Sequence, residues 1–152
     1  MSELATATGW FVSTLNGDAT LQALPGYDAT MGLVWDTVAA QGTTNPIFLI
    51  EPQGGSDKTT AMGGKRIKSL VYLLLKASGL AKDYTTLDTM ADRADYLLSP
   101  WPDGPNHFPI QVSSGAWILS CVRVDPHQST YDQGSKLWSE LGGLYAVEVK
   151  IK

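Results

Sequence analysis

The stretch RIKSLVYLLLKA, residues Arg66–Ala77, predicts a long β-strand and decides the fold class around it. Successive side chains of a strand point to opposite faces of a sheet, so the stretch divides into two alternating sets. The first set is Ile67, Ser69, Val71, Leu73 and Leu75, and the second is Lys68, Leu70, Tyr72, Leu74 and Lys76. Both sets are apolar at their centres. We therefore expect both faces of this strand to be covered by other elements.

A helix is predicted after this strand, over Leu87–Leu98. Its apolar residues recur every three or four positions and form one stripe, as in a helix that packs on a core. Thr85 and Asp88 resemble a capping box at its start. Asp88, Asp92 and Asp95 fall on the side opposite the stripe, where we expect them to be solvated.

The C-terminal part of the chain predicts two more strands. Pro100 ends the preceding helix, because a proline disfavours the helical conformation in the residue before it. Trp101–Pro109 then reads as a stiff, proline-rich loop. Ala116–Val124 and Leu144–Ile151 are rich in apolar and β-branched residues, which favours strands. Between these strands, Tyr131–Leu141 is predicted to hold a loop and a short helix.

The N-terminal part predicts two helices and then two strands. Ser2–Leu15 has apolar residues at helical spacing, and Asp18 can cap a short second helix over Ala19–Leu24. Gly32–Val38 and Pro46–Glu51 read as strands separated by turn-forming residues. Helices and strands are thus grouped along the chain, which is typical of α+β folds.

A polar stretch rich in glycine, Pro52–Gly64, separates the second of these strands from the long one. It reads as an excursion from the sheet, and segments of this length without their own core are usually functional. We therefore predict a single α+β domain over residues 1–152. A mostly antiparallel sheet is flanked by helices and carries a long glycine-rich loop or hairpin excursion.

Composition excludes several classes of protein. The 152 residues include one cysteine and two histidines, too few for an internal disulfide or an ordinary zinc site. The longest apolar run, Leu70–Leu75, is far shorter than the roughly 18 residues of a membrane-spanning candidate. The first ten residues lack the basic and apolar regions of a secretory signal. We expect a protein of the reducing cytoplasm with no membrane partner.

Charge is segregated along the chain although the net charge is only −4. Residues 1–57 contain six acids and no base, whereas residues 58–82 contain six bases and no acid. A nucleic-acid site is disfavoured, because the protein is acidic overall and the basic segment has few aromatic residues. The bases either lie on a solvated strand and loop or meet acidic surfaces of neighbouring subunits, where complementary charge sets orientation.

No catalytic or cofactor motif is found. Gly63-Gly64-Lys65-Arg66 superficially resembles a phosphate-binding loop, but the first glycine and the final serine or threonine of that motif are missing. His107 and His127 are predicted to lie in loops, and Cys121 to be buried in a strand as a structural residue. We expect no enzyme, no cofactor and no bound metal.

The five tryptophans leave one further class open. An exposed tryptophan can stack on a sugar ring, so a carbohydrate-binding module could use Trp35, Trp101 or Trp117. The alternative is that the tryptophans anchor the core or an interface between subunits, where aromatic residues are enriched.

Three stretches make the chain similar to the tail terminator, or tail-completion (head–tail joining), family of long-tailed bacteriophages. Leu15–Gly26 (LNGDATLQALPG) matches a short helix followed by Gly-Asp and Leu-x-Ala-Leu. Val34–Glu51 matches a strand, a gap with glycine, and Asn-Pro before an apolar strand. Trp138–Ile151 matches a closing strand after a glycine turn. The resemblance spans nearly the whole chain, but its motifs are patterns of glycine, proline and apolar residues.

The resemblance implies a structural protein of the virion, assembled in the host cytoplasm. It implies a homo-oligomeric ring, expected to be hexameric, at the head-proximal end of the tail tube. Such a ring ends tube polymerisation and joins the tail tube protein to the head–tail connector or stopper protein, while DNA passes through the lumen without specific binding. Another neck component, such as a head-completion or stopper protein, is the alternative. The candidate subunit-interface residues are Gly54, Gly55, Lys58, Lys65, Arg66, Lys68 and Trp101.

Overall fold

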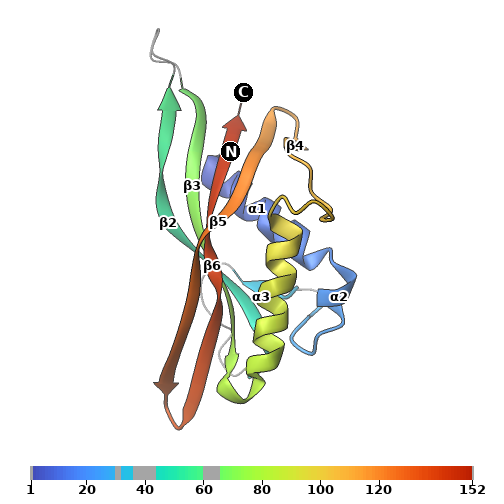
Figure 1. Cartoon of the computed structure of the whole chain (residues 1–152), viewed down its shortest axis with the longest axis vertical. Helices are drawn as coiled ribbons and strands as arrows, with labels where there is room; N and C mark the ends of the chain where they lie inside the picture. The colour runs from blue at the N-terminus through green and yellow to red at the C-terminus, as the bar shows by residue number, and fades with distance from the viewer. Residues whose placement is uncertain (1, 30–31, 36–43, 60–65, 152) are drawn as a thin grey trace.

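A six-stranded sheet in the order β1-β2-β3-β6-β5-β4 is the frame of the computed structural model (Figure 1). The structure describes residues 2–29, 32–35, 44–59 and 66–151. The strands are β1 (Val34–Trp35), β2 (Ile47–Thr59), β3 (Arg66–Leu80), β4 (Ile110–Ser113), β5 (Ala116–Gln133) and β6 (Lys136–Ile151). Among the strands of the described ranges, only the short β1–β2 pairing is parallel. The predicted α+β class with a mostly antiparallel sheet is confirmed.

The helical elements are α1 (Glu3–Asn16), α2 (Ala19–Gln22), the 3-10 turn η1 (Ala81–Asp83) and α3 (Tyr84–Leu98). Two of them begin with a side-chain cap, because Ser2 Oγ accepts from the Ala5 amide and Asp18 Oδ2 from the Leu21 amide. The capping box predicted for α3 is wrong, since the helix already begins at Tyr84.

The core lies between the helices and one face of the sheet. Phe11 from α1 meets Tyr145 from β6 edge to face, with ring centroids 5.6 Å apart. Trp10 packs in the same way against Phe108, 5.8 Å away, which ties the proline-rich loop to α1. Leu87, Met90, Ala94 and Leu98 supply the buried stripe of α3. The predicted helix stripe is therefore confirmed.

The two residue sets of β3 have different surroundings. Val71, Leu73 and Leu75 are buried under the helices, as predicted. Leu70 and Leu74 on the opposite face are only partly buried, because among the described residues α1 and α3 both pack on the first face. The expectation that this strand is covered on both sides is therefore not confirmed over Leu70–Leu74, whereas Lys76 on the same face is buried.

The glycine-rich excursion is a hairpin over its described part. Residues 52–59 continue β2 and pair with β3, from Gly55 opposite Val71 to Thr59 opposite Arg66. These residues are therefore strand and not loop. The remainder of the predicted excursion, residues 60–65, lies outside the described residues. Residues 52–59 and 66–71 are called the β2–β3 arm below.

A second hairpin replaces the loop and helix predicted over Tyr131–Leu141. β5 and β6 continue through this region and pair until Gln133 lies opposite Lys136. Gly134 and Ser135 form the turn, and Gly134 has a φ of +66°, the left-handed conformation that glycine tolerates. Residues 125–138 are called the β5–β6 arm. The two arms extend from opposite ends of the molecule (Figure 1).

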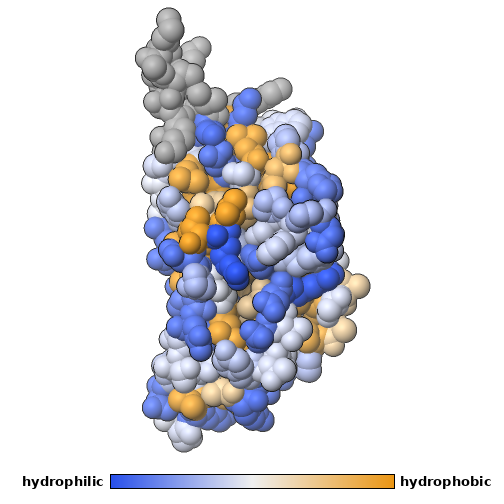
Figure 2. Space-filling model, viewed as in Figure 1, coloured by the Kyte–Doolittle hydropathy of each residue, from blue (hydrophilic) through white to orange (hydrophobic). Residues whose placement is uncertain are grey.

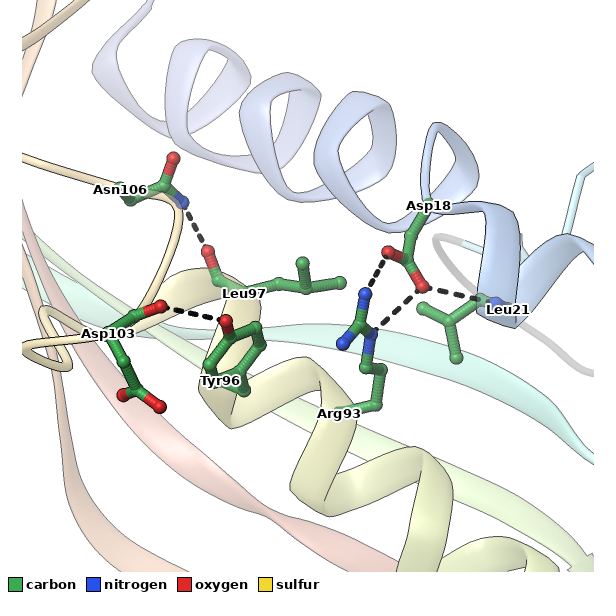
Figure 3. A network of polar contacts seen from close by, with 7 residues as sticks. All are labelled: Asp18, Leu21, Arg93, Tyr96, Leu97, Asp103 and Asn106. Carbon is green, nitrogen blue, oxygen red and sulfur yellow. Dashed lines mark hydrogen bonds and ion pairs between the residues drawn. The ribbon is translucent and has the colours of Figure 1, made fainter.

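Polar contacts hold α3 to the segments before and after it (Figure 3). Arg93 donates two hydrogen bonds to the carboxylate of Asp18, at 2.6 and 3.1 Å. The Tyr96 hydroxyl donates to the Asp103 carbonyl at 2.8 Å, and the Asn106 side chain donates to the Leu97 carbonyl. The predicted loop after Pro100 is thus confirmed as a loop, and it is fastened to the end of α3.

Candidate assembly interface

The sheet face opposite α1 and α3, called the outer face below, carries a strip of apolar side chains. Cross-strand pairing places Tyr72, Ala146 and Val122 in one row. The next row joins Leu74 of β3 to Leu144 of β6. Most of these side chains are partly exposed, and Val122 is 47% exposed. In the view of Figure 1, α1 passes behind the upper strands, and Figure 2 shows apolar side chains gathered over them.

Buried charges border this strip at its lower end. Lys76 Nζ lies 2.7 Å from Glu51 Oε1 and 2.9 Å from Glu140 Oε2. Lys76 and Glu140 are each only 8% exposed. Burial opposes the charge on Lys76, but its hydrogen bonds to Glu51 and Glu140 outweigh that effect and raise its pKa. Lys76 is therefore held as an ammonium ion between the side chains of Glu51 and Glu140.

His127 adjoins the same cluster from β5. Its Nε2 atom lies 3.8 Å from Glu140 Oε1 and is buried without a hydrogen-bond partner among the described residues. The prediction that His127 lies in a loop is wrong, because β5 continues past it. Its pairing with Gly142 places it on the row of Lys76.

The segregated charges partly neutralise one another within a single subunit. Lys68 binds Glu148 at 2.7 Å, so two bases of the basic segment, Lys68 and Lys76, have partners inside the chain. Two acids of the acidic segment, Asp18 and Glu51, are likewise paired. Charge segregation along the sequence therefore does not translate directly into one acidic and one basic surface.

The predicted interface residues of the glycine-rich segment fall on the β2–β3 arm. Lys58 lies opposite Lys68 in the register, and Arg66 lies opposite Thr59. Lys65 lies outside the described residues. The structure thus brings most of these residues to one end of the molecule, and their contact with a neighbour stays a prediction.

Gly54 and Gly55 determine the shape of this arm, because they allow a bulge in β2 and a close approach to the backbone of β3. The register shifts between Pro52 and Gly55, which marks a β-bulge, and Gly54 has a φ of +105°. A Cβ atom on Gly55 would lie 2.3 Å from the Leu70 carbonyl oxygen. Both glycines are exposed, so they form the arm's shape and part of its surface.

Trp101 lies apart from the arm, beside a hollow of about 300 Å³. It is 48% exposed, and its Nε1 donates to Asp95 Oδ2 at 3.2 Å. Arg123 also lines the hollow, with its Nε 3.8 Å from Asp95 Oδ1. Trp101 is therefore a surface aromatic that lies beside α3 and β5, far in sequence from the glycine-rich segment.

Asp95 is buried, contrary to the prediction of a solvated face. Ser99 Oγ donates to it at 2.8 Å and the Tyr145 hydroxyl at 3.1 Å. Burial and the neighbouring carboxylate raise the pKa of Tyr145, so this hydroxyl stays protonated and donates. The spacing of Asp95 and Ser99 at the end of α3 could have indicated their hydrogen bond from the sequence. The hydrogen bond from Tyr145 could not be predicted, because this residue lies on β6, far away in sequence.

The remaining candidates are Cys121 and the other tryptophans. Cys121 is fully buried, as predicted, and burial raises the pKa of its thiol, which disfavours the nucleophilic thiolate. Trp10 is a core residue, and Trp117 is partly buried. The side chain of Trp35 lies outside the described set.

Comparison with known proteins leaves the family open. Over the described residues, no group of three or more histidine, cysteine, aspartate or glutamate side chains is arranged to hold a metal ion. In the same part of the chain, no helix has the length and apolar character needed to cross a membrane. No family model matches the chain, and no curated protein matches it.

Proposed function

We propose that this protein is a structural assembly protein that forms a ring, expected to be hexameric, at the head-proximal end of a phage tail tube. The ring ends tube polymerisation and joins the tube protein to the head–tail connector. DNA passes through its lumen without specific binding. The protein acts by binding copies of itself and other proteins, and it catalyses no reaction.

The observation that carries this proposal is the elongated subunit with two different hairpin arms at opposite ends (Figure 1). A closed ring uses contacts between two different surfaces of each subunit, and this shape offers them. The partly exposed apolar strip on the outer face adds a third surface, suited to a tube or connector partner. The proposed position in the virion rests on the sequence resemblance to tail terminators.

Localisation and gene deletion in the source phage test this proposal. Electron microscopy of tagged particles should place the chain between tail tube and head. Phage lacking the chain should make tails of excess and variable length, because nothing ends polymerisation. Tails of normal length that fail to join heads would identify the alternative, a head-completion or stopper protein. Normal infectious particles without the chain would contradict both.

One observation favours a second candidate, a carbohydrate-binding module. Trp101 borders a hollow that also holds a carboxylate, Asp95, and a guanidinium group, Arg123. An aromatic ring beside polar groups is the usual arrangement for stacking on a sugar. Binding to a glycan array that disappears in Trp101→Phe at unchanged stability would support this candidate, whereas no binding by the wild-type chain would exclude it.

A further inference from the structure

An open groove lies between α1 and β2, near the base of the β2–β3 arm. Its volume is about 650 Å³, within the roughly 300–1,000 Å³ of binding clefts. The lining is mainly small or apolar and includes Leu4, Ala5, Gly9, Val12 and Ile50. Leu4 is 40% exposed at the rim, and a Cβ atom on Gly9 would meet nothing within 4 Å. The groove therefore has room for side chains from another molecule.

The β5–β6 arm has the opposite property, since apolar side chains protrude from it. Leu137 is 49% exposed and Tyr131 is 37% exposed. The last pair between β3 and β6 joins Leu80 to Trp138, so residues 131–137 extend beyond it as two strands only. A two-stranded hairpin is marginally stable in water by itself. Burial of Leu137 and Tyr131 on another surface would stabilise it.

We propose that the tip of the β5–β6 arm of one subunit binds in the groove between α1 and β2 of a second copy. This inference rests on the proposed self-assembly and names its contact. The groove is lined by α1 and by Ile50 and Pro52 of β2, whereas the β5–β6 arm extends from the other end of the molecule (Figure 1), so the described arm of a subunit does not reach its own groove. The contact joins two different surfaces and propagates from one copy to the next.

Charge supports this choice of occupant. In sequence, the two segments of the β2–β3 arm contain three bases, Lys58, Arg66 and Lys68, and one acid, Asp57, and Lys68 is already paired with Glu148 within the subunit. The β5–β6 arm carries two acids, Asp125 and Asp132, and one base, Lys136. The two segments thus differ in the sign of their net charge, and opposite charges attract and orient two molecules before contact.

The edges of β2 and β5 that have no partner strand among the described residues indicate that this contact uses side chains. Pro52 lacks a backbone donor, and the bulge at Gly54 follows it on β2. On β5, Pro126 follows a bulge between Arg123 and Asp125. Prolines and bulges on edge strands prevent the addition of a further strand. The arm therefore enters the groove through Leu137 and Tyr131 and does not extend the sheet.

Two variants of the full chain test the contact. Leu137→Asp places a charge on the β5–β6 arm where the apolar contact is expected, and it leaves the groove unchanged. Gly9→Leu fills the groove and keeps the arm, and it favours helix formation in α1. Analytical ultracentrifugation should show self-association at least ~10-fold weaker for each variant than for the wild type. Tyr84→Asp and Thr89→Leu, both at exposed positions of α3, are matched controls that should associate normally.

A mixture of the two variants is the decisive measurement. One partner supplies an intact groove and the other an intact arm, so we expect dimers that contain one of each and do not grow further. Circular dichroism confirms that each variant is folded. Variants that associate like the wild type, or folded variants whose mixture forms no dimer, would overturn the arm-and-groove contact and leave the ring proposal standing. A wild-type chain that stays monomeric at high concentration would overturn both.

Discussion

The two faces of the sheet carry similar apolar residues, but those on the inner face are buried and those on the outer face are partly exposed. The inner face buries Val71, Leu73 and Leu75 under α1 and α3, and they stabilise the subunit. The outer face leaves Leu70 and Leu74, from the same strand, partly exposed between ion pairs. An alternating apolar strand can therefore supply a core on one side and a partly exposed apolar surface on the other. Hydropathy alone does not distinguish the two roles.

The largest expected effect comes from comparing two neighbouring leucines. Leu73→Ala should lower the free energy of unfolding by about 2–5 kcal/mol, because Leu73 is fully buried and its loss leaves a cavity. Leu74→Ala should cost about 1 kcal/mol or less, since its side chain is already partly solvated. Urea unfolding of the two variants measures the difference. Equal losses would mean that the outer face is as closed as the core.

The buried charge cluster gives the next largest effect. Lys76→Met should destabilise the protein by about 3 kcal/mol, because Glu140 then stays buried without its counter-ion. The double variant Lys76→Met/Glu140→Leu should recover most of that loss. The raised pKa of Lys76 predicts that its contribution is full below the ordinary value of 10.5 and is lost as the pH rises through the raised value. If Lys76→Met lost little stability, the side chain of Glu140 would have to be in contact with water, and the cluster would not be buried.

On the helix side, the Asp18–Arg93 pair should have a smaller effect. Asp18→Ala removes both the α2 cap and the ion pair, and should cost about 1–2 kcal/mol. The hydrogen bonds from Arg93 hold the pKa of Asp18 below its ordinary 3.8. This contribution is full above that value and is lost as the pH falls through the lowered pKa. Unfolding of Asp18→Ala and wild type at neutral and acidic pH should therefore differ most at neutral pH.

The smallest effect is expected for the exposed ion pair on the outer face. Lys68→Ala should change stability by about 0–1 kcal/mol, and the change should shrink in high salt, because both partners are about one-third exposed. Thermal unfolding at low and high salt measures it. A salt-independent loss near that of Lys76→Met would contradict the distinction between the buried and the exposed pair.

Local pattern was sufficient for much of the fold. The strand at Arg66, the apolar stripe of α3 and the Asp18 cap follow from spacing and side-chain chemistry within a few residues. The β5–β6 arm was missed, because Tyr131–Leu141 has no clean apolar alternation. Its strands are held by pairing with each other, and the Gly134-Ser135 turn was the one local signal for it.

The candidate interface was predictable only in part. The glycine-rich segment and Trp101 were recognised as surface features, and the structure shows them exposed where it describes their side chains. The partners of Asp95 and Lys76 could not be predicted, because they come from residues distant in sequence. The groove beside Gly9 is likewise formed by a helix and a strand from different parts of the chain.

The sequence by itself determined that this protein is an α+β chain with one long apolar strand, a helix with an apolar stripe, and no catalytic motif. These properties depend on spacing and composition, which are local. Only the tertiary structure decided which face of the strand became the core, which charges neutralise each other within the subunit, and where the two arms extend. Those outcomes depend on strand pairing between distant segments, since pairing sets which side chains share a face.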